Sequence, residues 1–218
     1  MSDFDIAREN MVHNQLMANN VVEEHILEAF RLIPKEIFLP FEKKPKPYID
    51  EDIKIMNDRY LIEPRVMANI IKLSGIKKNH IIMDLVCSTG YTSAILSKLS
   101  KKVYGIDNKK DLIQEANLNI KKLNINNVNF LNKNPIIGIK KKFDIIYIFG
   151  GVEYIPIHLL DSLKNDGGSL VTVLYDNAQI GKIHIVKKIN GKISKTNFIT
   201  AQTPILKEFQ RTTKEFIF

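Results

Sequence analysis

Two acidic residues, Asp84 and Asp107, lie 23 positions apart around the one stretch of this sequence that is typical of a ligand-binding turn. Asp84 belongs to the apolar run 81–86, which leads into the small-residue turn 87–90, and Asp107 ends a second apolar run. In nucleotide-binding α/β folds, a tight turn after the first strand lets the backbone approach the ligand, and the acid that ends the next strand accepts hydrogen bonds from ribose hydroxyls. We therefore predict a nucleotide-like ligand at this turn, with Asp107 on its ribose.

The remaining residues that could do chemistry show no comparable pattern. Cys87 is the single cysteine of the chain, and no histidine lies nearby in the sequence to activate it, so we interpret it as a small apolar filler. The five histidines are far apart and lack the spacing of metal ligands, so we expect no metal site. A phosphate-binding loop with several glycines and a lysine is also missing from the sequence.

The elements that position the turn are strands alternating with helices. From residue 80 onward, short apolar runs predict five strands separated by helix-like patterns, and the dipeptide Asn190-Gly191 predicts a hairpin in the tail. This alternation predicts an α/β fold, a doubly wound Rossmann-like sheet with C-terminal β additions. The strands are expected at 81–86, 103–107, 128–131, 143–149, 170–174, 182–188 and 192–198, with a further edge or inserted strand at 215–218.

The first part of the chain is predicted to be a helical cap. Apolar residues recur at helical spacing up to Ile33-Pro34, the stretch 40–47 is rich in proline and predicts an extended connector, and Pro64 is suited to the first turn of another helix. We predict one domain over residues 1–218, in which residues 1–75 form the cap and substrate-side segment and residues 76–218 the ligand-binding core.

Composition places the protein among soluble intracellular proteins. The chain has 218 residues, 44% of them hydrophobic, and lacks both a long apolar span and an apolar N-terminal leader, so we expect a cytoplasmic protein that neither enters a membrane nor needs disulfides. The formal net charge is +8, but only five of the 32 basic residues are arginine and the lysines are scattered, so nucleic acid is not an expected partner.

Several segments together resemble the protein-L-isoaspartate O-methyltransferase family of class I S-adenosylmethionine (SAM)-dependent methyltransferases. Residues 84–91 are similar to its first motif, 103–107 to its second strand, and 163–171 to its leucine-lysine-x-glycine-glycine-x-leucine-valine motif. Residues 63–68 are similar to the substrate-side segment that precedes the SAM fold in that family.

This resemblance implies carboxyl methylation of isoaspartyl residues in damaged proteins, with SAM as cofactor, by a protein that we expect to act as a monomer. It implies that the cofactor is held by Asp84, Val86, Ser88, Gly90, Asp107 and Asn134. The acceptor carboxylate is already an anion near neutral pH, so alignment with the methyl group is the main task of the enzyme.

The sequence departs from the family at positions that matter for this expectation. Val86 and Ser88 stand where the first motif has glycine, and Ile62 stands where a serine helps to hold the acceptor carboxylate. We expect Arg59 to hold that carboxylate instead, because a guanidinium binds a carboxylate at two points. Two alternatives stay open: a non-catalytic relative that acts as a binding module and does not bind SAM, and a SAM methyltransferase with a different acceptor.

Overall fold

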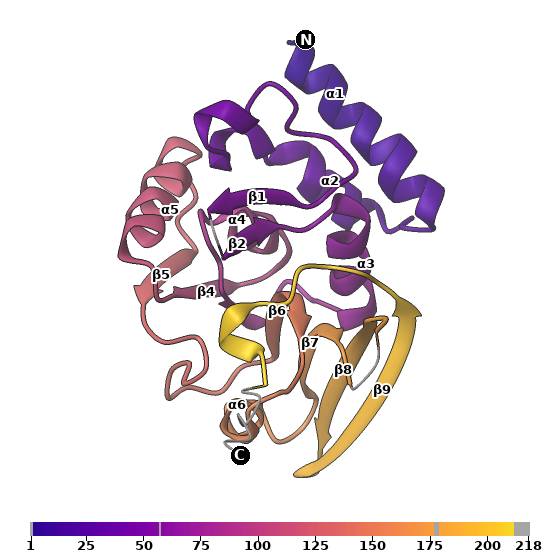
Figure 1. Cartoon of the computed structure of the whole chain (residues 1–218). Helices are drawn as coiled ribbons and strands as arrows, with labels where there is room; N and C mark the ends of the chain where they lie inside the picture. The colour runs from indigo at the N-terminus through magenta and orange to yellow at the C-terminus, as the bar shows by residue number, and fades with distance from the viewer. Residues whose placement is uncertain (1, 57, 177–178, 212–218) are drawn as a thin grey trace, which may run out of the picture.

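The computed structural model of the chain describes residues 2–56, 58–176 and 179–211. Its centre is a seven-stranded sheet with the strand order β5-β4-β3-β6-β7-β8-β9 (Figure 1). Strands β3 to β7 run parallel, and β8 and β9 are added antiparallel at one edge. The strands are β3 (Ile81–Leu85), β4 (Lys102–Asp107), β5 (Val128–Asn132), β6 (Ile145–Val152), β7 (Gly168–Leu174), β8 (Lys182–Ile189) and β9 (Lys192–Thr200).

The strand order reverses at β3, and this fixes where a ligand can bind. The chain proceeds from β3 to β4 and β5 on one side and then returns to β6 on the other side. In open parallel sheets, ligands bind outside the carboxyl ends of the strands at such a reversal. The turn after β3 lies at this point, so the predicted α/β class is confirmed, and a ligand at this turn stays a prediction.

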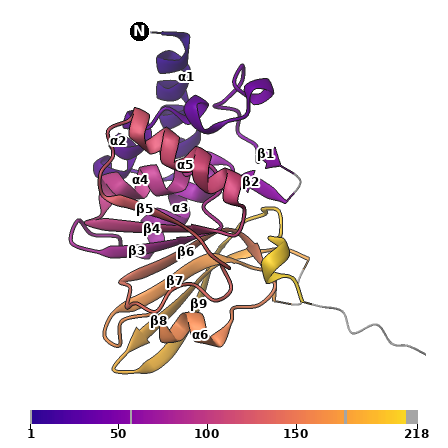
Figure 2. The ribbon, with the colours of Figure 1, turned by 90° about the vertical axis from the view of Figure 1, so that its left-hand side faces the viewer.

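The two faces of the sheet are covered differently, as Figure 2 shows. One face is covered by the helices α3, α4 and α5, and α1 and α2 pack outside them, all in a continuous cluster of buried apolar side chains. The other face carries the short helix α6, the connection between β5 and β6, and the segment after β9. The helices are α1 (Asp3–Met11), α2 (Glu24–Leu32), α3 (Pro64–Ser74), α4 (Tyr91–Leu99), α5 (Lys110–Lys122) and α6 (Ile157–Asp161).

The N-terminal part is helical, as predicted, and α3 begins at Pro64. The prediction of an extended connector at 40–47 is wrong. Residues Phe41–Lys43 form a short 3-10 helix (η4), because the amide of Lys43 donates to the carbonyl of Pro40 at 2.9 Å and closes a turn. A small hairpin of β1 (Ile53–Met56) and β2 (Arg59–Leu61), which the sequence did not reveal, then leads into α3.

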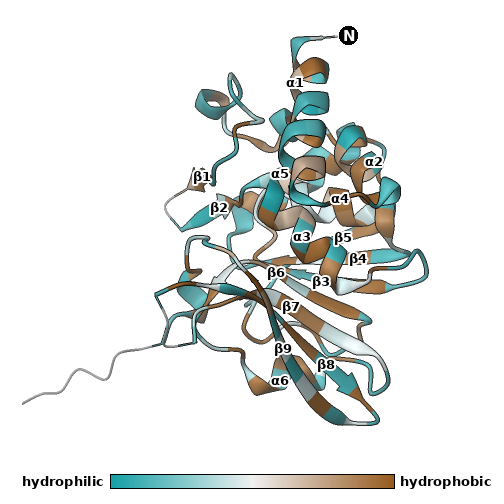
Figure 3. Ribbon diagram, turned by 90° about the vertical axis from the view of Figure 1, so that its right-hand side faces the viewer, coloured by the Kyte–Doolittle hydropathy of each residue, from teal (hydrophilic) through white to brown (hydrophobic). Residues whose placement is uncertain are grey.

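The C-terminal hairpin is present, with Asn190 and Gly191 both in the left-handed region that its tight turn requires. In Figure 3, β9 is hydrophobic toward its two ends and polar between them, and all of its residues are exposed. The run predicted as a strand at 215–218 lies outside the described residues. Within the part of the chain described, no helix has the length and apolar character needed to cross a membrane.

Candidate active site

The turn after β3 keeps a backbone shape that favours glycine. Val86, Ser88 and Gly90 have φ values of 61°, 51° and 92°, all in the left-handed region. A residue with a side chain pays roughly 1–2 kcal/mol to adopt this conformation, and a β-branched residue such as Val86 is rarely found there. The two glycine replacements noted in the sequence therefore strain the turn, in which both residues adopt the left-handed conformation that glycine favours.

Gly90 is needed for close packing as well as for its φ value. A Cβ atom at this position would lie 2.7 Å from Cζ of Phe130, which projects from β5. No real Cβ tolerates such a contact without a shift of its neighbour. The turn thus enters α4 directly against the sheet, and its amide groups stay close to the carboxyl ends of the strands.

Asp84 supplies a buried carboxyl group that is only half satisfied. Its Oδ2 accepts hydrogen bonds from Thr92 Oγ1 at 2.7 Å and from Ser93 Oγ at 2.6 Å. Its Oδ1 and the hydroxyl of Ser88 are buried and have no hydrogen-bond partner among the described residues. Burial raises the pKa of Asp84 to about 7, and the bonds from Ser93 and Thr92 oppose that rise. Two unpartnered buried polar atoms at the predicted ligand turn fit a polar ligand such as the methionine part of SAM.

Asp107 lies at the end of β4, as predicted, and is completely buried. Its Oδ2 accepts from Arg59 Nε at 2.9 Å and from the amide of Ser88 at 3.1 Å. Its Oδ1 accepts from Arg59 Nη2 at 2.9 Å and from the amide of Lys109 at 3.0 Å. The structure therefore joins two residues that the sequence assigned to different ligands, Asp107 to the ribose and Arg59 to the acceptor carboxylate.

Arg59 begins β2 and is also fully buried. Besides Asp107, its guanidinium bonds Glu208 Oε1 at 2.7 Å, Asn108 Oδ1 at 2.8 Å and the carbonyl of Asp58 at 2.9 Å. Burial alone would lower the pKa of Arg59, but the bonds to Asp107 and Glu208 outweigh it and raise the pKa above its ordinary value. The guanidinium is thus permanently charged and shared between the carboxylates of Asp107 and Glu208, with that of Asp58 farther away at 3.5 Å.

Glu208 reaches this site through the segment after β9, which follows the carboxyl end of β6. The amide of Gly151 donates to the carbonyl of Pro204, and the amide of Leu206 donates back to Gly151, each at 2.9 Å. A Cβ on Gly150 would lie 2.7 Å from Leu206, so the close approach needs glycine there. The short 3-10 helix η5 (Lys207–Phe209) then turns Glu208 toward Arg59. The local sequence gives no signal that Glu208 is a site residue, because it is a single acidic residue among basic, polar and apolar neighbours.

The other predicted site residues have separate environments. Ile62 is 1% exposed and packs in the main core, so it has no group that could hold a carboxylate. Asn134 is exposed two residues beyond Asn132, the register partner of Asp107, and its Oδ1 accepts from the amide of Ile136 at 2.9 Å. Cys87 is buried, and burial raises the pKa of its thiol, as suits a packing residue.

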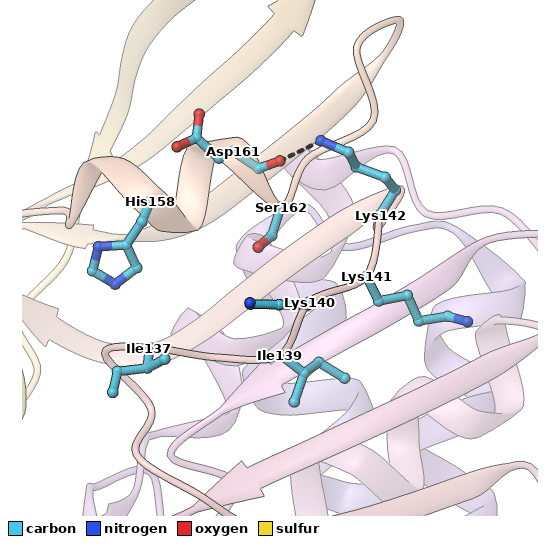
Figure 4. A pocket seen from close by; sticks show the side chains of 8 residues that line it. All are labelled: Ile137, Ile139, Lys140, Lys141, Lys142, His158, Asp161 and Ser162. Atoms are coloured by element: carbon cyan, nitrogen blue, oxygen red, sulfur yellow. Dashed lines mark hydrogen bonds between the residues drawn. The ribbon is translucent and has the colours of Figure 1, made fainter.

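A hollow of about 660 Å³ lies elsewhere, between α6 and the connection from β5 to β6. Figure 4 shows three consecutive lysines, 140 to 142, on its rim, with Lys142 bonded to the carbonyl of Asp161 at 2.6 Å. Its lining includes Ile137, Ile139 and His158 and none of the predicted cofactor or acceptor residues. It is therefore a feature separate from the turn after β3.

Comparison with known proteins shows one consistent family. A family model described as protein-L-isoaspartate (D-aspartate) O-methyltransferase matches residues 7–203. A protein-L-isoaspartate O-methyltransferase 2 from Geotalea uraniireducens is 28% identical over 91% of this chain and 92% of its own length. The enzyme of the same name from Shewanella sediminis is 31% identical over 77% of this chain and 69% of its own length.

Solved structures agree on the fold. A Plasmodium falciparum structure, described as a candidate protein-L-isoaspartate O-methyltransferase in complex with S-adenosyl-L-homocysteine, has a TM-score of 0.79 and 21% sequence identity. The superposition covers 92% of this chain and 98% of the Plasmodium chain. A second structure, named protein-L-isoaspartate O-methyltransferase, has a TM-score of 0.77, 22% identity and coverage of 91% of this chain and 65% of its own.

Proposed function

Because the chain belongs to the protein-L-isoaspartate O-methyltransferase family, whose members are SAM-dependent carboxyl methyltransferases, we propose that it methylates isoaspartyl carboxylates in damaged proteins. The match over residues 7–203 carries this proposal, since it spans both the substrate-side segment and the SAM core. The reasons to consider a non-catalytic relative were Val86, Ser88 and Ile62. Val86 and Ser88 both adopt the left-handed conformation that glycine favours in this turn.

The chain's own residues divide the work as follows. The turn at 86–90 and the free Oδ1 of Asp84 would hold the methionine part of SAM, and Asp107 its ribose. SAM supplies an electrophilic methyl group on sulfur. The protein has to orient the acceptor carboxylate toward that methyl and exclude water, and no general base is needed because the acceptor is already ionised.

Neither of the two residues expected at the acceptor carboxylate is free to bind it. Ile62 does not donate a hydrogen bond, and Arg59 is engaged with Asp107 and Glu208. Arg59 can serve the acceptor only after it has left Asp107. A methyltransferase acting on a different carboxylate is therefore the second candidate, and the departure at Ile62 is the observation that favours it.

A transfer assay tests the proposal directly. Purified protein, SAM with a labelled methyl group and a peptide containing one isoaspartyl residue should yield a base-labile methyl ester on the peptide. The same peptide with ordinary aspartate is the matched control and should stay unlabelled. Equal labelling of both peptides, or of neither while SAM binds, would contradict the isoaspartyl assignment.

The proposal includes a cytoplasmic monomer that does not bind nucleic acid. The scattered distribution of lysine and the small share of arginine among the basic residues support the absence of nucleic-acid binding. Size-exclusion chromatography with light scattering should give a mass near 25.0 kDa. Addition of duplex DNA at physiological salt should leave that elution unchanged.

A further inference from the structure

We propose that Arg59 competes with the ribose of SAM for Asp107, and that cofactor binding shifts the guanidinium from Asp107 toward Glu208. The identity of the cofactor rests on the proposed function, whereas the exchange of partners rests on the geometry of these three side chains. Arg59 then sets the affinity for the cofactor, and Glu208 keeps the guanidinium paired after it has left Asp107.

The carboxylate of Asp107 has no acceptor site left for a further donor. A carboxylate offers about four lone pairs to hydrogen-bond donors. Arg59 Nε and the amide of Ser88 occupy Oδ2, and Arg59 Nη2 and the amide of Lys109 occupy Oδ1. A ribose hydroxyl that donates to Asp107 must therefore displace one of these four donors.

Arg59 is the only one of these donors that can leave without unfolding the turn. The donors from Ser88 and Lys109 are backbone amides, fixed by the turn after β3 and by the start of α5. Arg59 binds through a flexible side chain whose two bonds to Asp107 can be given up together. The position of the cofactor's ribose and the position of the guanidinium are thus mutually exclusive.

Displacement is feasible because Arg59 already has other acceptors. Its Nη1 and Nη2 lie 3.4 Å and 2.7 Å from the carboxylate oxygens of Glu208, and Asn108 and the carbonyl of Asp58 accept from the same guanidinium. A buried guanidinium that lost Asp107 with no second carboxylate would be left without a counter-charge, which is costly. Glu208, at 2.7 Å, is the nearer of the two remaining carboxylates, and Asp58 Oδ2 lies 3.5 Å from Nη1, so the charge stays paired.

Substitutions of Arg59 and of Glu208 should change the affinity for the cofactor in opposite directions. Arg59→Gln frees Asp107 for the ribose and should tighten the binding of S-adenosylhomocysteine by about tenfold. Glu208→Gln leaves Arg59 with Asp107 and with the more distant carboxylate of Asp58, 3.5 Å from Nη1, and should weaken binding by about tenfold. Arg59→Lys keeps the charge but loses the two-point grip, so its affinity should lie between those of the parent and Arg59→Gln.

The experiment is a calorimetric titration of each full-length variant with S-adenosylhomocysteine, without any acceptor. Arg31→Gln is the matched control, because Arg31 pairs with Glu9 and Glu24 on the N-terminal helices and has no part in the site. Its affinity should equal that of the parent. Circular dichroism and a urea midpoint establish that each titrated variant is folded.

Tighter binding by folded Arg59→Gln together with weaker binding by Glu208→Gln would support the exchange. Unchanged or weaker binding by folded Arg59→Gln would overturn it. If Arg59→Gln does not fold, Arg59→Lys and Glu208→Gln still decide, and tighter binding by Glu208→Gln would overturn the role of Glu208. Failure of the methyl-transfer assay with these affinities in the expected order would refute the isoaspartyl activity and leave the exchange standing.

Discussion

Lys35 carries a buried ammonium group whose replacement by methionine should stabilise the protein. Its side chain is 0% exposed, and its Nζ has no hydrogen-bond partner among the described residues. Burial lowers the pKa of Lys35 from 10.5 to about 8, against the opposing attraction of Asp52 and Asp50. Methionine has a similar length, no charge and good adaptability in a core, so Lys35→Met removes the cost of burying the charge.

The magnitude follows from the two pKa values of Lys35. A depression from 10.5 to about 8 corresponds to about 3 kcal/mol, at roughly 1.4 kcal/mol for each pKa unit. A base whose pKa is lowered on folding binds fewer protons in the native state than in the unfolded one between these pH values. The native state therefore carries the full penalty below pH 8 and loses it as the pH rises toward 10.5.

Urea denaturation of the parent and of Lys35→Met, at pH 7 and at pH 10, measures the effect. At pH 7 the variant should be more stable by about 3 kcal/mol, which corresponds to roughly 6–12 °C in Tm for a chain of this size. At pH 10 most of that difference should be gone. Residues that titrate identically in both proteins cancel in the comparison.

Lys164→Met serves as the control, because Lys164 is partly exposed and pairs with Asp144 at 2.7 Å. A partly exposed ion pair contributes about 1 kcal/mol or less, so this variant should show little change at either pH. The reasoning about Lys35 would be refuted if Lys35→Met were less stable at pH 7, or if its advantage were the same at pH 7 and pH 10.

Three further perturbations address the turn and the C-terminal segment. Burial raises the pKa of Asp84 to about 7, so the native state loses stability as the pH rises from about 4 to 7. In urea denaturation, Asp84→Asn should therefore be more stable than the parent by about 4 kcal/mol at pH 8 and by almost nothing at pH 4. Ser88→Gly should raise the free energy of unfolding by about 1–2 kcal/mol, because it relieves the left-handed strain and removes an unpartnered hydroxyl. Ser88→Ala removes only the hydroxyl, so its free energy of unfolding should rise by less. Gly150→Ala should cost about 1–3 kcal/mol through its clash with Leu206, and faster hydrogen exchange at the amide of Gly151 would locate the damage, while unchanged exchange would contradict the packing described.

The strands and the ligand turn could be predicted because their signals are local. Apolar runs of strand length alternate with helical periodicity from Ile81 to Leu174, and the order of these elements is enough to place the turn after β3 at the edge where ligands bind. The hairpin at Asn190-Gly191 was equally clear, because two adjacent left-handed residues specify that turn.

The contacts of the site could not be predicted, because they are long-range. Arg59 and Asp107 are 48 positions apart, and Arg59 and Glu208 are 149 apart, so no spacing rule connects them. A single arginine in a short connector is compatible with an exposed or a buried position. The fold places the start of β2 beside the end of β4, and the Arg59 guanidinium is therefore bonded to Asp107 and Glu208 instead of being free for an acceptor.

The path of residues 204–209 along β6 also has a consequence for the order of events on the ribosome. Arg59 and Asp107 leave the ribosome well before Glu208. A growing chain can therefore form the Arg59–Asp107 pair before Glu208 has been synthesised. Contacts of such large separation form late in folding. A nascent or prematurely terminated chain would therefore hold its ribose-binding carboxylate blocked. By the proposed exchange, affinity for the cofactor would rise about tenfold once the tail has docked, so that incomplete chains would sequester less SAM.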